Sequence, residues 1–310
     1  MSAIKIISHQ SPDTDAACSA IVYAWYQKNY LQTDAQAYIY GSINREAEFV
    51  LQKFGIDMPP QITAVTSEDK LIITDTSNPE ELVPSLYEAA ILEVVDHHKL
   101  GGLKTANPIR VTIWPYASCC SVMWKLFKYE NHTEIPAKIA GLMVSAILSD
   151  TLKFTSPTTT EFDKQAAQDL AQIAGVEIDQ LADEMFSAKS DLTGMTNKDI
   201  LLSDSKIFKM NDKKVRISVL ETTKPDNALK MLDSLKETMV ELKQEEQLDY
   251  IFFFIVDIIK TEGITVTTNE AEVKIAEKAF NKEFTSGLQY LPGVVSRKKQ
   301  MVPGIETALT

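Results

Sequence analysis

The stretch Ser8-His9-Gln10-Ser11-Pro12-Asp13-Thr14-Asp15 follows the apolar run Ile4-Lys5-Ile6-Ile7, which is typical of a buried strand. The segment from His9 to Asp15 places one imidazole and two carboxylates directly after that strand. In an open α/β sheet, ligands bind outside the carboxyl ends of the strands. This stretch therefore predicts both an α/β fold and the edge of the sheet at which a site would form.

Two further apolar runs end in the same way. Ile91-Leu92-Glu93-Val94-Val95 is followed by Asp96-His97-His98, and Leu71-Ile72-Ile73-Thr74 is followed by Asp75. Mixed imidazole and carboxylate ligands suit divalent first-row metals better than they suit calcium. Three strands that end in such side chains favour a metal-dependent hydrolase.

Each of these residues also has an ordinary structural explanation. Asp15 stands where it could cap a helix over residues 16–30, because Asp is a favoured N-cap residue. Asp75 and Asp150 could be loop residues after a strand and after a helix over 136–148. We favour metal binding because the candidates occur together: His9, Asp13, Asp15, Asp75, His97 and Asp150. Six ligands are too many for one open zinc site and suit two metals bridged by one carboxylate.

The order of the expected elements divides the chain into two domains. Strands alternate with helices over residues 1–187, which predicts a mostly parallel sheet with helices on both faces. The small, polar stretch at 188–194 indicates a linker that acts as a hinge. Residues 195–310 predict a smaller α+β domain with a hairpin around Asn211-Asp212. We expect the active site in the cleft between the two domains.

Composition limits the partners and the compartment. The chain has 310 residues and a net charge of −12, which argues against general affinity for nucleic-acid phosphates. Three cysteines are too few for a disulfide framework, and no basic segment with a long apolar stretch precedes the first strand. The apolar window at 250–259 is too short to span a bilayer. We expect a cytoplasmic protein without nucleic-acid or membrane partners.

A cationic cluster, Ser296-Arg297-Lys298-Lys299-Gln300, stands out in this acidic chain. It could be a solvated tail. It follows Leu291-Pro292-Gly293-Val294-Val295, however, so it could also lie on an ordered loop. Guanidinium and ammonium groups are the usual phosphate ligands, which makes the cluster a candidate phosphate site.

Together these motifs resemble the manganese-dependent, family II inorganic pyrophosphatases of the DHH phosphoesterase superfamily. The resemblance covers essentially the whole chain and rests on His9-x-x-Pro12-Asp13-Thr14-Asp15, Asp75, Asp96-His97-His98, Asp150 and Ser296-Arg297-Lys298-Lys299-Gln300. The family usually has Gly where Ser8 and Ala117 stand here. These departures leave the ligand set intact and concern local backbone geometry.

The resemblance implies roles for particular residues. One metal would be held by His9, Asp13 and Asp75, and the other by Asp15, Asp75, His97 and Asp150. The substrate phosphates would be bound by the catalytic residues His98, Lys206, Arg297 and Lys298. Asp96 would orient one of these ligands. The family also implies two tight Mn²⁺ sites, with Co²⁺ possible, Mg²⁺ that arrives with the substrate, and a homodimer through the N-terminal domain.

The expected reaction is hydrolysis of inorganic pyrophosphate to two phosphates by a hydroxide that bridges two metals. One alternative is another DHH phosphoesterase, acting on oligonucleotides, cyclic dinucleotides or polyphosphate. Nucleotide-binding members usually carry a Gly-Gly-Gly-His-type motif, and no glycine pair follows Gly101-Gly102. A second alternative is a non-catalytic protein that senses metal or phosphate. A sensor would more readily have lost a ligand, whereas all six positions are filled.

Overall fold

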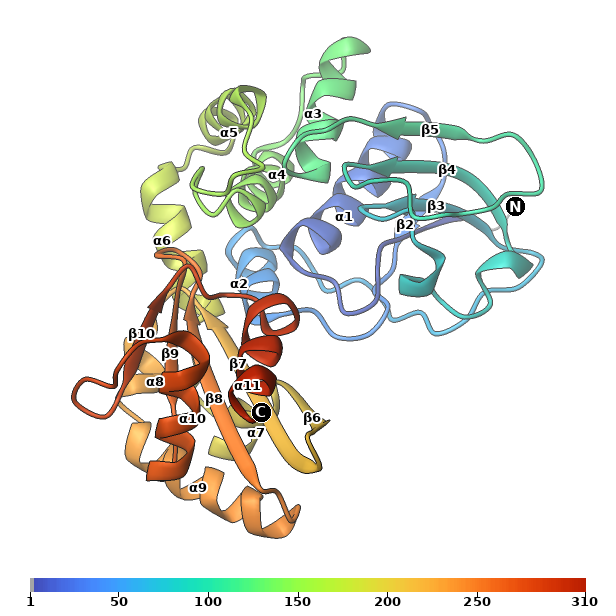
Figure 1. Ribbon diagram of the computed structural model, residues 1–310. Helices are drawn as coiled ribbons and strands as arrows, with labels where there is room; N and C mark the ends of the chain where they lie inside the picture. The colour runs from blue at the N-terminus through green and yellow to red at the C-terminus, as the bar shows by residue number, and fades with distance from the viewer. Residues whose placement is uncertain (1–2) are drawn as a thin grey trace. The chain divides into compact units, whose positions relative to one another are not determined.

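The computed structural model describes residues 3–310. The chain divides into two compact units between Ala188 and Lys189, and each is built around its own five-stranded sheet (Figure 1). Every helix in the described part of the chain is too short or too polar to cross a bilayer.

The first unit contains a wholly parallel sheet in the order β2-β1-β3-β4-β5. Its strands are β1 (Ile4–Ile7), β2 (Ala35–Ala37), β3 (Lys70–Thr74), β4 (Ala90–Asp96) and β5 (Arg110–Ile113). In the register, Ile6 pairs with Ile72, and Thr74 pairs with Val95. The parallel strands bring the ends of β1, β3 and β4 to one edge of the sheet, and the predicted α/β class is confirmed.

The two faces of this sheet are covered differently. Alternating strand residues such as Ile6 and Ile72 point into a core formed with the α-helices, and Ile7 and Ile73 point to the opposite face. The helices that contribute to this core are α1 (Thr14–Asn29), α2 (Arg45–Lys53), α3 (Cys119–Tyr129), α4 (Ala137–Asp150), α5 (Glu161–Ala174) and α6 (Ile178–Lys189). The other face packs against the region of two short 3₁₀ helices, η1 (Pro79–Glu81) and η2 (Leu86–Glu88).

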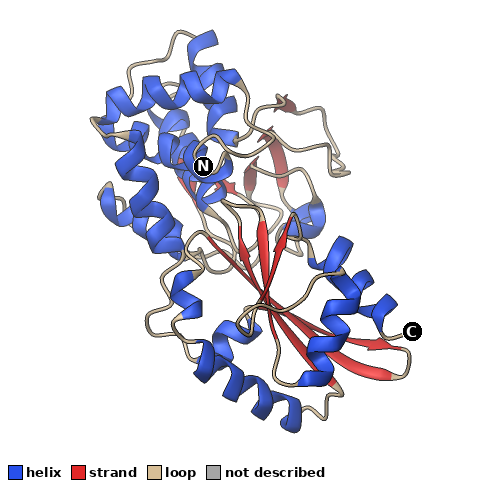
Figure 2. Ribbon diagram, turned by 60° about the vertical axis from the view of Figure 1, so that its left-hand side comes forward, coloured by secondary structure: helices blue, strands red, loops and turns tan. Residues whose placement is uncertain are grey.

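The second unit has a mixed sheet in the order β10-β9-β8-β7-β6, shown in red with its twist in Figure 2. Its strands are β6 (Asp204–Met210), β7 (Lys213–Thr222), β8 (Tyr250–Asp257), β9 (Glu262–Val266) and β10 (Gln289–Pro292). Strands β7 and β8 are parallel, and the other pairs are antiparallel. The β6–β7 hairpin turns at Asn211-Asp212, as predicted, with both residues at positive φ.

Helices pack on both faces of the second sheet. They are α7 (Asn197–Leu202), α8 (Asp226–Leu229), α9 (Leu232–Glu245), α10 (Glu270–Phe280), the π-helical turn η3 (Arg297–Met301) and α11 (Val302–Ala308). Helices α7 and α9 pack on the face that carries Ile251 and Phe253. Helices α10 and α11 pack on the face that carries Phe252 and Phe254.

Local contacts decide where helices in both units begin and end. Asp13, and not Asp15, caps α1, because the Asp13 side chain accepts a hydrogen bond from the Ala16 amide. The start of the expected linker is helical, because buried Met185 and Phe186 anchor α6 and carry it on to Lys189. Residues 226–245 form two helices, α8 and α9, which are separated at residues 230–231.

Candidate metal centre

The edge of the first sheet gathers two groups of imidazole and carboxylate ligands. In one, His9 Nε2 lies 3.9 Å from Asp13 Oδ1 and 3.6 Å from Asp75 Oδ2. In the other, His97 Nε2 lies 3.8 Å from both Asp15 Oδ2 and Asp150 Oδ2. These atoms are close enough to share an ion without already being bonded to one another. The structure thus brings together all six side chains that the sequence singled out.

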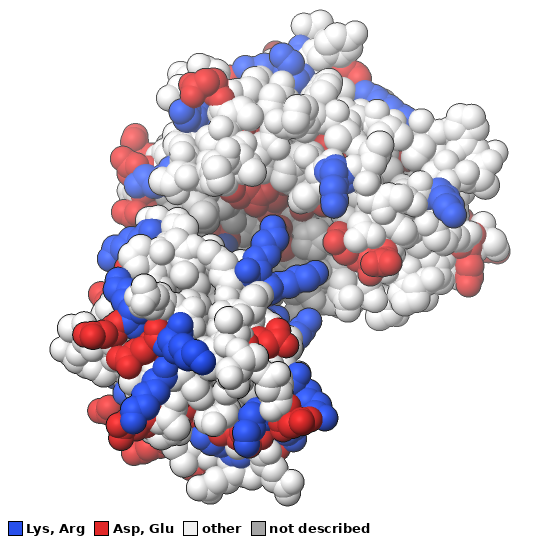
Figure 3. Space-filling view, in the orientation of Figure 1, with Lys and Arg blue, Asp and Glu red and all other residues white. Residues whose placement is uncertain are grey.

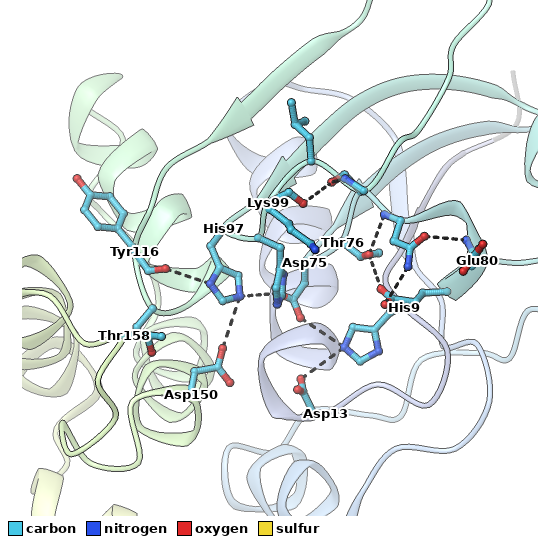
Figure 4. Close-up of a pocket in the computed structure, with 17 residues that line it drawn as sticks. His9, Asp13, Asp75, Thr76, Glu80, His97, Lys99, Tyr116, Asp150 and Thr158 are labelled. Carbon is cyan, nitrogen blue, oxygen red and sulfur yellow. Dashed lines mark hydrogen bonds and ion pairs between the residues drawn. The ribbon is translucent and has the colours of Figure 1, made fainter. Parts of the chain in front are cut away.

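Asp75 connects the two groups. Its Oδ2 faces His9, and its Oδ1 lies 3.2 Å from His97 Nε2, so the carboxylate stands between the two imidazoles (Figure 4). Asp75 has a positive φ of 63°, which is costly for a residue other than glycine, and its amide donates to the Val95 carbonyl. The backbone holds this carboxylate in a geometry that suits a bridging ligand.

Both imidazoles are oriented by backbone carbonyls. His9 Nδ1 donates to the carbonyl of Gln10 at 3.0 Å, and His97 Nδ1 donates to the carbonyl of Tyr116 at 3.1 Å. The proton on Nδ1 leaves the Nε2 lone pair directed towards the carboxylates, which is the tautomer a metal ligand needs.

Two of the facing atoms have no hydrogen-bond partner among the described residues. Both His97 Nε2 and Asp75 Oδ1 are buried, and both are unsatisfied. Buried polar groups are normally bonded, so an unsatisfied pair needs an explanation. A divalent cation would supply one, and nitrogen and oxygen donors of this kind fit such a cation.

The electrostatics of the centre also favour a cation. Burial lowers the pKa of His9 and of His97, but the adjacent Asp75 carboxylate and other nearby carboxylates outweigh burial and raise each pKa to about 9. Burial, Asp15 and Asp13 raise the pKa of Asp150. Positive charge is therefore stabilised here, and a metal ion is one way to provide it.

Asp15, in the first turn of α1, is fully buried against the N-terminus of helix α3. It accepts hydrogen bonds from the Ser118 hydroxyl (2.9 Å) and from the amides of Cys119 (2.5 Å) and Cys120 (3.1 Å). A helix N-terminus carries partial positive charge, which stabilises the carboxylate. These contacts fix Asp15 with one oxygen towards His97.

The Asp96 side chain holds the His98 imidazole beside these two groups of ligands. Asp96 Oδ1 accepts hydrogen bonds from the His97 and His98 amides and from His98 Nδ1 at 3.0 Å. The hydrogen bond to Asp96 raises the pKa of His98. The Asp96 side chain is buried, whereas that of His98 is 55% exposed, so Asp96 aims an accessible imidazole.

Five of the six candidate ligands, all except Asp15, line a pocket of about 850 Å³ in the first unit, and acidic side chains are visible in a hollow of this unit in Figure 3. The lining also includes Thr76 and Lys99, which Figure 4 labels, and Asn78, none of which was singled out from the sequence. Lys99 directly follows His97-His98, so extending that motif by one residue would have found it.

The other predicted substrate ligands lie in the second unit. Lys206 is on β6, two residues after Asp204, and Asp204 Oδ1 forms an ion pair with Arg297 Nη2 at 2.7 Å. Arg297 and Lys298 begin the turn η3, so the cationic cluster is ordered and is not a loose tail. Within this unit the fold brings η3 to the start of the strand that carries Lys206.

Gln300 shapes the loop that precedes these cations. Its side-chain oxygen accepts hydrogen bonds from the amides of Val295 and Ser296, and its amide donates to the Gly293 carbonyl. The Ser296 hydroxyl caps η3 by accepting from the Lys299 amide. The cations therefore extend from a backbone that is tied down on both sides.

Two family models match the chain, one for each unit. The DHH family, N-terminal domain, matches residues 3–147, and the DHHA2 domain matches residues 183–308. A Bacillus licheniformis protein, named a probable manganese-dependent inorganic pyrophosphatase, is 38% identical over 310 residues, which is 100% of this chain and 99% of the relative. The chain belongs to the manganese-dependent inorganic pyrophosphatase family.

Further members of the pyrophosphatase family match over nearly the full length. A Lactobacillus johnsonii relative with the same name is 36% identical and covers 98% of this chain and 97% of its own. A solved structure from Methanococcus jannaschii, assigned to the family II inorganic pyrophosphatases, is 34% identical, with a TM-score of 0.68 over 98% of this chain and 99% of that one. The family predicted from the motifs is confirmed.

The two departures from the pyrophosphatase pattern cause no backbone strain. Neither Ser8 nor Ala117 has a positive φ, so a Cβ is tolerated at both positions. Both residues are buried. The Ala117 amide donates to both carboxylate oxygens of Asp163, at 3.1 and 3.2 Å, which fixes the loop before Ser118.

Proposed function

We propose that this chain hydrolyses inorganic pyrophosphate to two phosphates at a centre that holds two Mn²⁺ ions. The observation that carries the proposal is the position of the Asp75 carboxylate, with one oxygen towards each of two imidazole–carboxylate groups. The names of the full-length relatives support pyrophosphate as the substrate and manganese as the metal. Co²⁺ is an alternative ion at these sites, and Mg²⁺ accompanies the substrate.

The proposal assigns the six ligands to two sites. His9, Asp13 and Asp75 hold one cation, and Asp15, Asp75, His97 and Asp150 hold the other. Two such cations, when bound, lower the pKa of a water molecule and offset the charge of the phosphates. The protein fixes the positions of the two cations by orienting their ligands. Backbone carbonyls accept hydrogen bonds from the two imidazoles, and the N-terminus of α3 holds Asp15.

Cationic side chains bind the substrate in this proposal. His98, aimed by Asp96, donates a hydrogen bond or a proton to a phosphate oxygen. Lys206, Arg297 and Lys298 of the second unit neutralise phosphate charge, which is the largest demand in phosphoryl transfer. We propose residues 1–187 as the metal-binding domain, 195–310 as the substrate-binding domain and 188–194 as the connection between them.

We also propose a cytoplasmic homodimer that forms through the first unit. Strand β5 supports such a surface, because it lies at the edge of the sheet and its Val111 is 52% exposed. Sedimentation velocity should give a species of twice the chain mass of 34.6 kDa. A species of single chain mass at micromolar concentration would argue against the dimer.

A substrate comparison tests the proposed activity. Phosphate release is measured with pyrophosphate, tripolyphosphate, ATP and a dinucleotide, each with Mn²⁺ and Mg²⁺ present. We expect rapid release from pyrophosphate and at most slow release from the others. Preferential cleavage of the dinucleotide would replace the proposal with a nucleotide phosphodiesterase, and no cleavage of any substrate would favour a sensor.

A further inference from the structure

A buried glutamate outside the proposed ligand set lies beside the metal centre. Glu46 is in the first turn of α2, which is capped by Asn44, and its side chain is completely buried. Figure 1 shows α2 close to α1 and α4, and contacts between these helices are present. Burying a carboxylate costs free energy unless other groups form hydrogen bonds with it. The groups that bond to Glu46 therefore indicate what Glu46 stabilises.

Two hydroxyl groups donate hydrogen bonds to one oxygen of this carboxylate. Thr14 Oγ1 lies 2.8 Å from Glu46 Oε2, and Ser149 Oγ lies 2.6 Å from the same atom. Both donors are buried, Thr14 at 0% and Ser149 at 5% exposure. A hydrogen bond to an ionised acceptor is stronger than one between neutral groups, so this junction is firm.

Each donor is next to a proposed metal ligand. Thr14 lies between Asp13 and Asp15 at the start of α1, and Ser149 precedes Asp150 at the end of α4. The Glu46 oxygen therefore ties together the two helix ends that carry three of the six ligands.

We propose that Glu46 is a positioning residue that sets the cation affinity of the site formed by Asp15, Asp75, His97 and Asp150. It acts in two ways: it fixes the separation of the segments that carry Asp15 and Asp150, and its negative charge favours a cation nearby. Groups that orient metal ligands typically change affinity by about 10- to 100-fold. The proposal rests on the metal sites proposed above.

The chain offers a matched control in Glu272. It too is in the first turn of a helix capped by an asparagine, Asn269, and it too is completely buried. It lies in the second unit, where it accepts hydrogen bonds from Lys243 Nζ, the Ile251 amide and Thr268. Loss of Glu272 reports the general cost of removing such a carboxylate, without any metal ligand beside it.

The test is a titration of the full-length, metal-free protein with Mn²⁺. Binding is measured by calorimetry and by the electron paramagnetic resonance signal of free Mn²⁺. The variants are Glu46→Gln and Glu46→Ala, and Glu272→Gln is the control. We expect two tight sites in the parent chain and a loss of at least about tenfold in affinity at one of them in Glu46→Ala. The Mn²⁺ affinity of Glu46→Gln should lie between those of the parent chain and Glu46→Ala, because glutamine keeps a hydrogen-bond acceptor but loses the charge. Glu272→Gln should lower the unfolding midpoint and leave both affinities unchanged.

Hydroxyl variants test the same link without altering the carboxylate. Thr14→Val removes the donor and keeps the side-chain shape, whereas Thr14→Ser keeps the donor. We expect weaker Mn²⁺ binding in Thr14→Val and in Ser149→Ala, and nearly parental binding in Thr14→Ser. These variants decide the matter if Glu46→Ala does not fold.

The outcomes separate this inference from the function on which it rests. If both Mn²⁺ sites kept the affinity of the parent chain in Glu46→Gln, Thr14→Val and Ser149→Ala, the role of Glu46 would be overturned. The proposed function would still stand. A parent chain that binds fewer than two Mn²⁺ ions would overturn both.

Discussion

Ser118 donates a hydrogen bond from its hydroxyl to Asp15 Oδ1 at 2.9 Å and so joins a ligand on α1 to the N-terminus of α3. The same hydroxyl accepts a hydrogen bond from the Cys120 amide and caps α3. One side chain therefore stabilises a helix and orients a proposed metal ligand, and its loss should affect both properties.

We predict that Ser118→Ala lowers the free energy of unfolding by about 1 kcal/mol, the usual effect of removing an N-cap. It should also weaken Mn²⁺ binding, because Asp15 loses one of its three donors. Urea denaturation and a Mn²⁺ titration measure the two effects. The control is Asn269→Ala, which removes the N-cap of α10. It should lower the free energy of unfolding and leave Mn²⁺ binding unchanged. Equal Mn²⁺ affinities in Ser118→Ala and the parent would argue against the link to Asp15.

Asp75→Asn should have the largest effect of any single ligand change. The amide keeps the shape but loses the charge that faces both imidazoles, so both cation sites should weaken. We expect hydrolysis of pyrophosphate to fall by more than about a hundredfold. Calorimetry with Mn²⁺ should show both tight sites affected. Loss of only one site would show that Asp75 does not bridge.

Lys298→Ala should separate substrate binding from metal binding. Removing one cation that neutralises phosphate charge should lower turnover by roughly 10²–10³-fold. The Mn²⁺ affinities should stay close to those of the parent, because Lys298 belongs to the second unit. The charge-matched control is Lys299→Ala, which removes the neighbouring lysine and should retain most activity. Parallel loss of turnover and metal binding in Lys298→Ala would contradict this division of roles.

Gly101→Ala should damage the pocket through the backbone. An added Cβ would lie 2.5 Å from Asn78 Cα and 2.6 Å from the Asn78 nitrogen, and neither backbone atom can turn aside. The segment after His97-His98 would have to move away from the loop after β3. We expect lower activity and a lower unfolding midpoint, measured by phosphate release and thermal denaturation.

The neighbouring glycine provides the control for that prediction. A Cβ on Gly102 meets nothing within 4 Å, although its φ of +89° disfavours alanine. Gly102→Ala should therefore cost roughly 1 kcal/mol of stability and retain activity. If both variants behaved alike, backbone strain and not the contact with Asn78 would be the cause.

The candidate ligands could be grouped from the sequence because each follows a strand or a helix with a clear apolar pattern. Parallel strands must bring the residues after β1, β3 and β4 to one edge, so His9, Asp75 and His97 could be grouped before any geometry was known. Strand β5 was missed, because Arg110–Ile113 is short, lies at the edge of the sheet and is only half-buried.

Other features depend on contacts that spacing does not encode. Asp13 and Asp15 both suit an N-cap, and only the burial of Asp15 against α3 assigns the cap to Asp13. Glu46 gave no signal, since its hydrogen bonds to Thr14 and Ser149 join segments that are distant in sequence.

The most direct test of the central claim is phosphate release from pyrophosphate by metal-free protein as Mn²⁺ is added in Mg²⁺ buffer. The account predicts that activity rises with bound Mn²⁺ and reaches its maximum at two ions per chain. Full activity without Mn²⁺, a maximum at one ion per chain, or no release at any Mn²⁺ concentration would contradict it.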